Sequence, residues 1–360
     1  MQVGIVGLPN VGKSTLFNAL TAAGAQAANY PFCTIDPNVG VVAVPDDRLD
    51  ALAEVFSPDR VTPTAIEFVD IAGLVEGASA GEGLGNQFLG HIRQVDAILH
   101  IVRCFPSADV VHVYGGVDPL RDKEVIDTEL ALADLQLVEK RHERVGKQVQ
   151  TGRKELAAEL AGLGKLLPAL REGRPARTVE LTAAEVEAVR SYGLLTRKPV
   201  IYAANVSEAD VAAAVAALAS AAVAEGAALV AVCGDLEAEL ATLPREDRHA
   251  FLADIGLPES GLRRVIHAAY DLLGLLTFFT AGPKEVRAWT IRRGETAVEA
   301  AGEIHTDMAR GFIRAEIVGW EDFVESGRSM SRAKELGLVR SEGKEYVMAD
   351  GDITYFRFNV

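Results

Sequence analysis

The chain has 360 residues, 49% of them hydrophobic, which allows a large buried core and favours about two or three domains. Its formal net charge of −15 excludes a surface that is basic all over, so any contact with RNA has to be local. The three cysteines, Cys33, Cys104 and Cys233, stand apart without the spacing of a metal site, and so sparse and odd a set fits a reducing cytosol.

The sequence predicts a cytoplasmic protein that makes no contact with a membrane. It opens directly on an apolar run that we interpret as a strand, so we expect no signal peptide. The segment most like a membrane span, residues 211–232, contains Ser220, Glu225 and Gly226 and is rich in alanine rather than leucine. We expect a helix followed by a strand there.

The first motif is a glycine loop at residues 7–14, with the sequence Gly-Leu-Pro-Asn-Val-Gly-Lys-Ser. It matches the pattern G-x-x-x-x-G-K-[ST] and lies between a predicted strand and a predicted helix, the context that a phosphate-binding loop requires. The backbone N–H groups of such a loop converge on one anion, and the helix N-terminus adds partial positive charge. We expect Lys13 to reach the outer phosphates of a nucleotide in a catalytic role, and Ser14 to bind Mg²⁺.

The segment that follows the first helix is an irregular loop, rich in proline and asparagine, at residues 29–38. It precedes a predicted strand at residues 39–44. In nucleotide switches a loop in this place supplies a threonine to Mg²⁺, and Thr34 is the candidate. A threonine that only forms a turn is the alternative.

The predicted strand at residues 65–69 ends in Asp70, with Gly73 three positions further on. In this arrangement the aspartate holds the magnesium shell, and the Gly73 N–H senses the terminal phosphate. Leu74 follows, where many small GTPases place a glutamine that orients the attacking water, so catalysis needs another group or runs slowly. His112, in a later polar loop, is a candidate for arranging that water, although an unpaired histidine is more often structural.

Between about residue 119 and residue 198 glycine becomes rare and leucine recurs at helical spacing. We expect an antiparallel helical hairpin, inserted into the nucleotide domain and broken in the middle by Gly146 and Gly152. A basic tip inside an acidic protein indicates either an ordinary solvated helix face or a contact with RNA or the ribosome. The basic residues of this tip are Lys140, Arg141, Arg144, Lys147, Arg153 and Lys154.

The nucleotide domain resumes with a predicted strand at residues 199–204 and the segment Asn205-Val206-Ser207-Glu208. GTPases carry N-K-x-D here, and the aspartate accepts two hydrogen bonds from guanine. Val206 and Glu208 replace the lysine and the aspartate, whereas the amine of adenine can donate to the Val206 carbonyl or the Asn205 side-chain oxygen. We therefore expect ATP to bind, with GTP weaker or comparable, and Cys233 to lie near the base.

From about residue 276 the chain has the pattern of a separate module of strands with a short helix at residues 296–302. Its acidic and basic residues nearly balance, so charge alone does not predict RNA binding there. The expected domains are a nucleotide-binding domain of residues 1–120 and 199–275, a helical insertion of residues 121–198 and a C-terminal domain of residues 276–360.

These motifs together closely resemble those of the YchF family, the Obg-like ATPases of the translation-factor class of P-loop proteins. The resemblance covers essentially the whole chain. It is carried by the segments at residues 7–14, 29–35, 70–74, 128–135, 205–208, 301–307 and 311–313.

The resemblance implies an α/β P-loop G domain, an inserted coiled-coil hairpin and a C-terminal ubiquitin-like (β-grasp) TGS domain. It places Ser14 and Thr34 on the metal, Val206 on the adenine and His112 where the family has a loop histidine implicated in hydrolysis. It also places Asn10 where some relatives bind K⁺. The residues that it implies for the phosphates are Asn10, Val11, Gly12, Lys13, Ser14 and Thr15.

The function that we predict is slow, Mg²⁺-dependent ATP hydrolysis by a molecular switch that associates with the large ribosomal subunit. Loss of phosphate would release the loops around Thr34 and Gly73 and change how the hairpin and the TGS domain engage the ribosome and its RNA. The alternatives are a GTP-specific Obg-type GTPase and a binding module that senses nucleotide without useful turnover. We expect the chain to act as a monomer.

Overall fold

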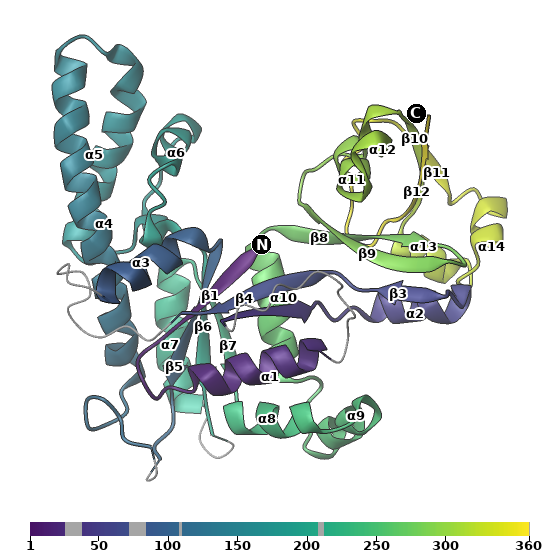
Figure 1. Cartoon of the computed structure of the whole chain (residues 1–360), viewed down its shortest axis with the longest axis horizontal. Coiled ribbons are helices and arrows are strands. Elements are labelled where there is room, and N and C mark those ends of the chain that lie inside the picture. The colour runs from purple at the N-terminus through teal and green to yellow at the C-terminus, as the bar shows by residue number, and fades with distance from the viewer. Residues whose placement is uncertain (26–37, 72–83, 108–109, 208–211, 360) are drawn as a thin grey trace. The chain divides into compact units, whose positions relative to one another are not determined.

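The computed structural model describes residues 1–25, 38–71, 84–107, 110–207 and 212–359 (Figure 1). The contacts between residues divide the chain into two compact units. The first takes in Met1–Ala23 and Glu67–Ala269, and the second takes in Val41–Ile66 and Tyr270–Val360. Within the described ranges, no helix has both the length and the apolar character needed to cross a membrane.

The first unit centres on a six-stranded sheet with the strand order β2-β4-β1-β5-β6-β7. Neighbours from β4 to β7 pair in parallel, and every residue of β5 and β6 is buried, as expected for central strands that are covered on both faces. This is the α/β architecture that the sequence predicted. The strands are β1 (Gln2–Val6), β2 (Val39–Ala43), β4 (Ala65–Asp70), β5 (Ala97–Arg103), β6 (Val200–Asn205) and β7 (Ala228–Val232).

Helices connect these strands, and α4 and α7 pack against the sheet at β5, β6 and β7. The helix and strand expected at residues 211–232 are α7 and β7. The helices of this unit outside the insertion are α1 (Lys13–Ala25), α3 (Leu84–Gln94), α7 (Ala212–Glu225), α8 (Gly234–Thr242), α9 (Arg245–Asp254) and α10 (Gly261–Leu272).

The helical insertion consists mainly of two long helices that lie side by side, α4 (Pro119–Gln150) and α5 (Ala157–Arg171), followed by the short α6 (Ala183–Arg190) (Figure 1). The Asp118 side chain caps α4, and Pro119 occupies its first turn, where a missing N–H costs nothing. The three helices share an apolar core of their own. Its buried members include Val138, Val145, Leu163, Leu166, Leu170 and Val189.

The prediction that Gly146 breaks the hairpin is wrong, because α4 continues through it to Gln150. The turn comes at Gly152, whose φ of +105° suits glycine. A glycine inside a helix costs about 1 kcal/mol relative to alanine. At Gly146 a Cβ would lie 3.8 Å from Leu160, an ordinary contact, so the packing of α4 on α5 leaves room for an alanine there.

The second unit centres on another six-stranded sheet, with the order β11-β10-β12-β8-β9-β3. Its edge strand β3 (Arg60–Thr62) pairs in parallel with β9, and α2 (Asp47–Phe56) packs on β8 and β9. By their contacts α2 and β3 therefore group with the C-terminal part of the chain, whereas β2 and β4, which flank them in sequence, pair within the first sheet. The other elements are β8 (Leu275–Ala281), β9 (Glu285–Arg292), α11 (Ala297–Ile304), α12 (Thr306–Arg310), β10 (Phe312–Val318), α13 (Trp320–Glu325), α14 (Met330–Glu335), β11 (Arg340–Glu342) and β12 (Ile353–Phe358).

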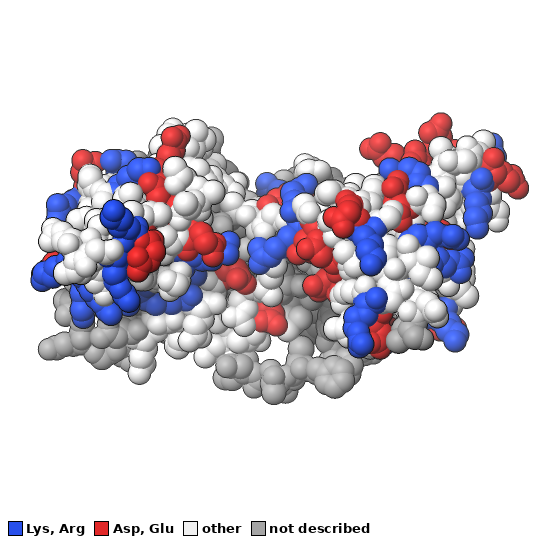
Figure 2. Space-filling model, turned by 90° about the horizontal axis from the view of Figure 1, so that it is seen from above, with Lys and Arg blue, Asp and Glu red and all other residues white. Residues whose placement is uncertain are grey.

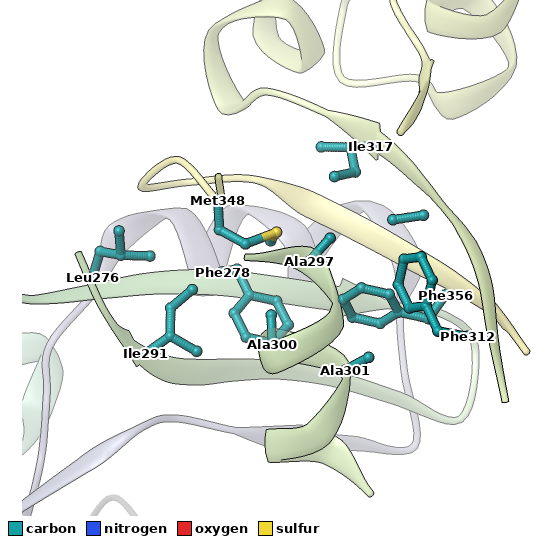
Figure 3. Packing of buried hydrophobic residues seen from close by; sticks show 11 residues of the cluster. Leu276, Phe278, Ile291, Ala297, Ala300, Ala301, Phe312, Ile317, Met348 and Phe356 are labelled. Carbon is teal, nitrogen blue, oxygen red and sulfur yellow. The ribbon is translucent and has the colours of Figure 1, made fainter. Parts of the chain in front are cut away.

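Both faces of this second sheet are covered, as β8 shows most directly. Phe278 and Phe279 are adjacent and fully buried, and they belong to different clusters because successive strand residues point to opposite faces. Phe278 packs with Phe356 and with the alanines of α11 (Figure 3). Phe279 lies in the cluster that includes Leu52 of α2.

Candidate functional site

The candidate site forms where four strands of the first sheet end. The glycine loop follows β1, Asp70 ends β4, Arg103 ends β5 and Asn205 ends β6. Because parallel strands present their carboxyl ends at one edge, the glycine loop, Arg103 and Asn205 meet although they are far apart in sequence, and Asp70 lies near Lys13 but outside the described lining of the cavity. This edge is where open α/β sheets bind their ligands.

A cavity of about 350 Å³ opens at this edge, within the range of small-molecule sites. All six residues that we expected on the phosphates line it, together with Asn205. The lining residues are Asn10, Val11, Gly12, Lys13, Ser14, Thr15, Arg103, Phe105, Ser107, Val110, Asn205, Gly234 and Asp235.

The glycine loop has the backbone that a phosphate cradle needs. Gly12 has a φ of +97°, and Asn10 has a φ of +62°, which is uncommon for a residue with a side chain. The Lys13 ammonium turns back over the loop and donates to the carbonyls of Gly7 at 3.1 Å and Leu8 at 2.8 Å. Burial lowers the pKa of Lys13, and the nearby charge of Asp70 acts in the opposite direction.

The buried side chain of Asn205 fixes the loop from the far strand. Its amide donates to the Val11 carbonyl at 2.9 Å, and its oxygen accepts the Gly234 N–H at 3.1 Å. A Cβ at Gly12 would overlap this amide, so the close approach of Asn205 also explains the glycine. The Asn205 oxygen is thus already engaged by a backbone donor.

Asp70 and Ser14 fit a magnesium site. The Asp70 Oδ1 is buried and has no hydrogen-bond partner among the described residues, and Ser14 is exposed to the cavity. Burial raises the pKa of Asp70, although the positive charge of Lys13 opposes this shift. Mg²⁺ prefers one or two carboxylates plus phosphates and water, so one buried carboxylate beside a hydroxyl is a donor set that fits this ion.

Several predicted site residues are not part of this cavity or cannot be placed. Thr34, Gly73 and Glu208 lie outside the described residues. As far as the described residues go, the lining does not include Val206, which is buried, or Cys233, which is the N-cap residue of α8.

Sequence reasoning missed Arg103. It is 2% exposed, and its guanidinium donates to the carbonyls of Phe105 at 3.0 Å, Val110 at 3.1 Å and Asn10 at 3.3 Å. It thereby ties the phosphate loop to the segment that follows β5. A single arginine after an apolar run matches no motif, so only the charge at the end of a buried strand could have indicated this role.

His112 lies near the cavity but not in its described lining, whereas Val110 of the same loop contributes to it. The His112 side chain is buried. Its Nδ1 accepts the Tyr114 N–H at 3.2 Å, and its Nε2 lies 2.8 Å from a carboxylate oxygen of Asp122 on α4. The structure therefore gives this loop histidine a partner that the sequence did not indicate.

Comparisons with known proteins match the whole chain. Residues 275–359 match a family model for the C-terminal region of YchF GTPases, described as "Protein of unknown function (DUF933)", and residues 2–142 match one described as "50S ribosome-binding GTPase". The chain is 55% identical to the "Ribosome-binding ATPase YchF" of Bacillus subtilis, covering 100% of both chains. It is 54% identical to the protein of that name in Escherichia coli O157:H7, covering 100% of this chain and 99% of the relative.

Solved structures agree with this result. The structure of the Schizosaccharomyces pombe YchF GTPase matches with a TM-score of 0.87 and 38% identity, over 99% of this chain and 97% of that one. A GTP-binding protein from Pyrococcus horikoshii, with a TM-score of 0.63 and 20% identity over 100% of both chains, shares the fold. On the identity and coverage of these relatives, the chain belongs to the YchF family.

Proposed function

We propose that this protein is a Mg²⁺-dependent ATPase that acts as a nucleotide switch on the ribosome. The observation that carries the proposal is the cavity at the carboxyl edge of the sheet, lined by residues 10–15 with Lys13 among them. A loop of this geometry offers backbone N–H groups, a helix N-terminus and an ammonium group to a triphosphate. The names of the Bacillus subtilis and Escherichia coli relatives support the choice of ATP and of the ribosome.

Single-turnover hydrolysis of ATP, measured with and without ribosomes, tests this function. We expect hydrolysis to depend on Mg²⁺, to be slow alone and to be accelerated by ribosomes. Lys13→Ala should abolish nucleotide binding or turnover, whereas Lys284→Ala, at an exposed lysine of the other unit, should change neither. Unchanged hydrolysis in Lys13→Ala would show that the loop is not the site, and a rate that no partner accelerates would favour a nucleotide-sensing module.

We infer that adenine is recognised through the backbone carbonyl of Val206. Its N–H already donates to the Val232 carbonyl at 2.9 Å, which fixes this peptide at the end of the sheet. A direct test is competition of ATP and GTP for the protein, followed by the double change Val206→Lys and Glu208→Asp, which restores the guanine pattern. We expect the wild type to bind ATP more tightly than GTP, and the double variant to bind GTP more tightly than the wild type does. A strong GTP preference in the wild type would overturn the inference.

For the metal we propose Ser14, Thr34 and Asp70 as the protein groups that hold Mg²⁺ and its water shell. When bound, the ion neutralises charge on the phosphates and so assists their transfer. The Gly73 N–H would sense the terminal phosphate, and Asn10 is the candidate residue beside K⁺. Comparing hydrolysis in KCl with hydrolysis in NaCl tests the K⁺ site, because equal rates would exclude K⁺ activation.

For the partners we propose that the insertion is a coiled-coil hairpin, that the second unit contains a TGS domain, and that both contact ribosomal RNA. Figure 2 shows basic and acidic side chains intermixed on the visible face, so RNA would be met locally rather than by one broad basic surface. At the tip of the hairpin, Arg144, Arg153 and Lys154 are exposed. We further propose a cytoplasmic monomer, which sedimentation with and without nucleotide would test.

His112 is the group that we propose for arranging the attacking water, since Leu74 has no polar group for that task. His112→Ala should slow hydrolysis while leaving the affinity for ATP unchanged. If His112→Ala and the wild type hydrolyse ATP at equal rates, the role of His112 is structural.

A further inference from the structure

The contact between His112 and Asp122 brings together two buried side chains at the start of α4, outside the described lining of the cavity. The Nε2 atom of His112 lies 2.8 Å from the Oδ2 atom of Asp122, and 5% and 2% of the two side chains are exposed. Within the described residues neither atom has a well-aligned hydrogen bond to any group. The two atoms are therefore in close contact without an aligned hydrogen bond, and a buried carboxylate oxygen without a donor is costly unless a neighbour compensates it.

The carboxylate of Asp122 is held in place from its other side. Its Oδ1 accepts from Nε of Arg121 at 3.0 Å and from Nη2 at 2.7 Å. Arg121 in turn donates to the Gly116 carbonyl at 2.6 Å and lies over the ring of Tyr114. The next residue on α4, Lys123, is paired with Asp127 and Glu225. The first turn of α4, which contains Asp122, is thus held in place by hydrogen bonds and ion pairs to its surroundings.

The imidazole of His112 has no nitrogen left for a water molecule in this arrangement. Its Nδ1 accepts the Tyr114 N–H, so a neutral ring carries its proton on Nε2, which faces Asp122. The ring is also outside the described lining of the nucleotide cavity. In this arrangement His112 is consequently held against α4, outside the described lining of the cavity in which it would act.

The loop of His112 is nevertheless connected to the phosphate loop. The side-chain amide of Asn10 donates to the carbonyl of Val111 at 3.2 Å, and Asn10 itself has a backbone conformation that is uncommon outside glycine. A change of the phosphate loop on binding nucleotide would therefore act on the residue next to His112.

We propose that Asp122 is a positioning residue that holds His112 in a retracted place, and that hydrolysis requires His112 to leave this carboxylate. The proposal rests on the function proposed above for His112. Because a retracted group works only during the fraction of time that it is released, the observed rate is the intrinsic rate multiplied by that fraction. Removing the carboxylate should raise the basal rate.

The test is single-turnover and steady-state ATP hydrolysis by the full chain without ribosomes. We expect Asp122→Ala to raise kcat about tenfold with KM unchanged. Asp122→Asn keeps the shape and one acceptor oxygen, so we expect a smaller rise. Glu124→Ala, at an exposed carboxylate two residues further along α4, is the matched control and should not differ from wild type. If folded Asp122→Ala, as judged by circular dichroism and Tm, has an unchanged or lower kcat, the proposal is overturned.

A double-mutant cycle tests whether Asp122 acts through His112. In a His112→Ala background, Asp122→Ala should have no further effect on kcat, because coupled residues do not act additively. An equal acceleration in both backgrounds would overturn the proposal. The nitrogen NMR signals of the His112 ring give a separate readout: Asp122→Ala should shift them in the nucleotide-free protein, and unchanged signals would refute the holding contact.

The two proposals can fail separately. If His112→Ala hydrolyses ATP at the wild-type rate, the function proposed for His112 is wrong, while the NMR signals still report whether Asp122 holds the ring. If His112→Ala slows hydrolysis but Asp122→Ala neither accelerates it nor shifts the ring signals, only the holding role is wrong.

Discussion

The side-chain amide of Asn205 donates to the carbonyl of Val11 at 2.9 Å, while its oxygen accepts the Gly234 N–H at 3.1 Å. One buried side chain thus joins the phosphate loop, the end of β6 and the start of α8. In the sequence Asn205 is the first residue of the segment that corresponds to the base-recognition motif N-K-x-D of GTPases. In the fold it also sets the shape of the loop that receives the phosphates.

Asn205→Ala should weaken ATP binding by about ten- to a hundredfold, because a hydrogen bond contributes about 1 kcal/mol and the buried partners of Asn205 would be left unsatisfied. Titration with a fluorescent ATP analogue measures the effect. Asn18→Ala, at an exposed asparagine on α1, is the control and should bind normally. Normal binding by Asn205→Ala would mean that the phosphate loop keeps its shape without the hydrogen bonds of Asn205.

Two glycine-to-alanine changes should have opposite results. Gly12→Ala places a Cβ against the Asn205 amide at a φ of +97°, so we expect loss of ATP binding and destabilisation by about 1–3 kcal/mol. Gly146→Ala places a Cβ 3.8 Å from Leu160, an ordinary contact inside a helix, and should stabilise the protein by about 0.5–1 kcal/mol. Thermal unfolding of both variants beside wild type gives the comparison. If both variants were equally destabilised, the conformational argument would not hold.

His100 should make the stability of the first unit depend on pH. Burial lowers its pKa to about 4, against a rise caused by Asp127 and a further lowering by Lys123. The folded state therefore binds fewer protons than the unfolded state between the unfolded pKa of about 6.5 and pH 4, so stability is present above pH 6.5 and is lost as the pH falls. The difference amounts to about 3 kcal/mol across that window.

Urea unfolding between pH 7.5 and pH 4.5 measures this dependence. His100→Gln cannot gain a proton, and its curve should flatten in that range. His305→Gln, at a histidine whose side chain is 61% exposed, should retain the wild-type slope. Parallel curves for wild type and His100→Gln would show that other groups govern the acid response.

Asp70 should make Mg²⁺ dependence sensitive to pH. Since burial raises the pKa of Asp70, protons compete with Mg²⁺ at a higher pH than at an ordinary aspartate, and the Mg²⁺ needed for half-maximal hydrolysis should rise on acidification. Mg²⁺ titrations at several pH values between 5 and 8 give the curve. Asp70→Asn should need more Mg²⁺ at every pH and lose the dependence, while Asp254→Asn, at the exposed end of α9, should behave as wild type.

Reversing charge at the hairpin tip should weaken ribosome binding. The double change Arg144→Glu with Lys154→Glu should lower the affinity for ribosomes at least about tenfold and flatten its salt dependence, because fewer phosphates are neutralised. The control makes the same charge change elsewhere on the insertion, at Arg174 and Arg190, which pair with Glu172 and Glu187. Co-sedimentation at two salt concentrations compares them; equal losses would indicate a general charge effect rather than a contact at the tip.

The features that the sequence predicted are those with a local signal. The glycine loop and the apolar strand β6 could be recognised within a few residues, because the spacing of a motif and a run of apolar side chains are local properties. Arg103, Asp122 and β3 could not be recognised in this way. Their roles depend on partners brought close by the fold, such as the pairing of Arg60 with Glu285 in parallel strands.

The pairing of β3 with β9 has a consequence for how the polypeptide matures. During synthesis α2 and β3 leave the ribosome early, but the strands and apolar side chains that cover Leu49 and Leu52 come from the C-terminal third. The nascent chain must therefore carry this apolar segment uncovered until translation is nearly complete. A protein shortened at residue 275 would retain α2 without its packing partners. Such a truncation would leave an aggregation-prone fragment with exposed apolar residues rather than an independent nucleotide-binding domain.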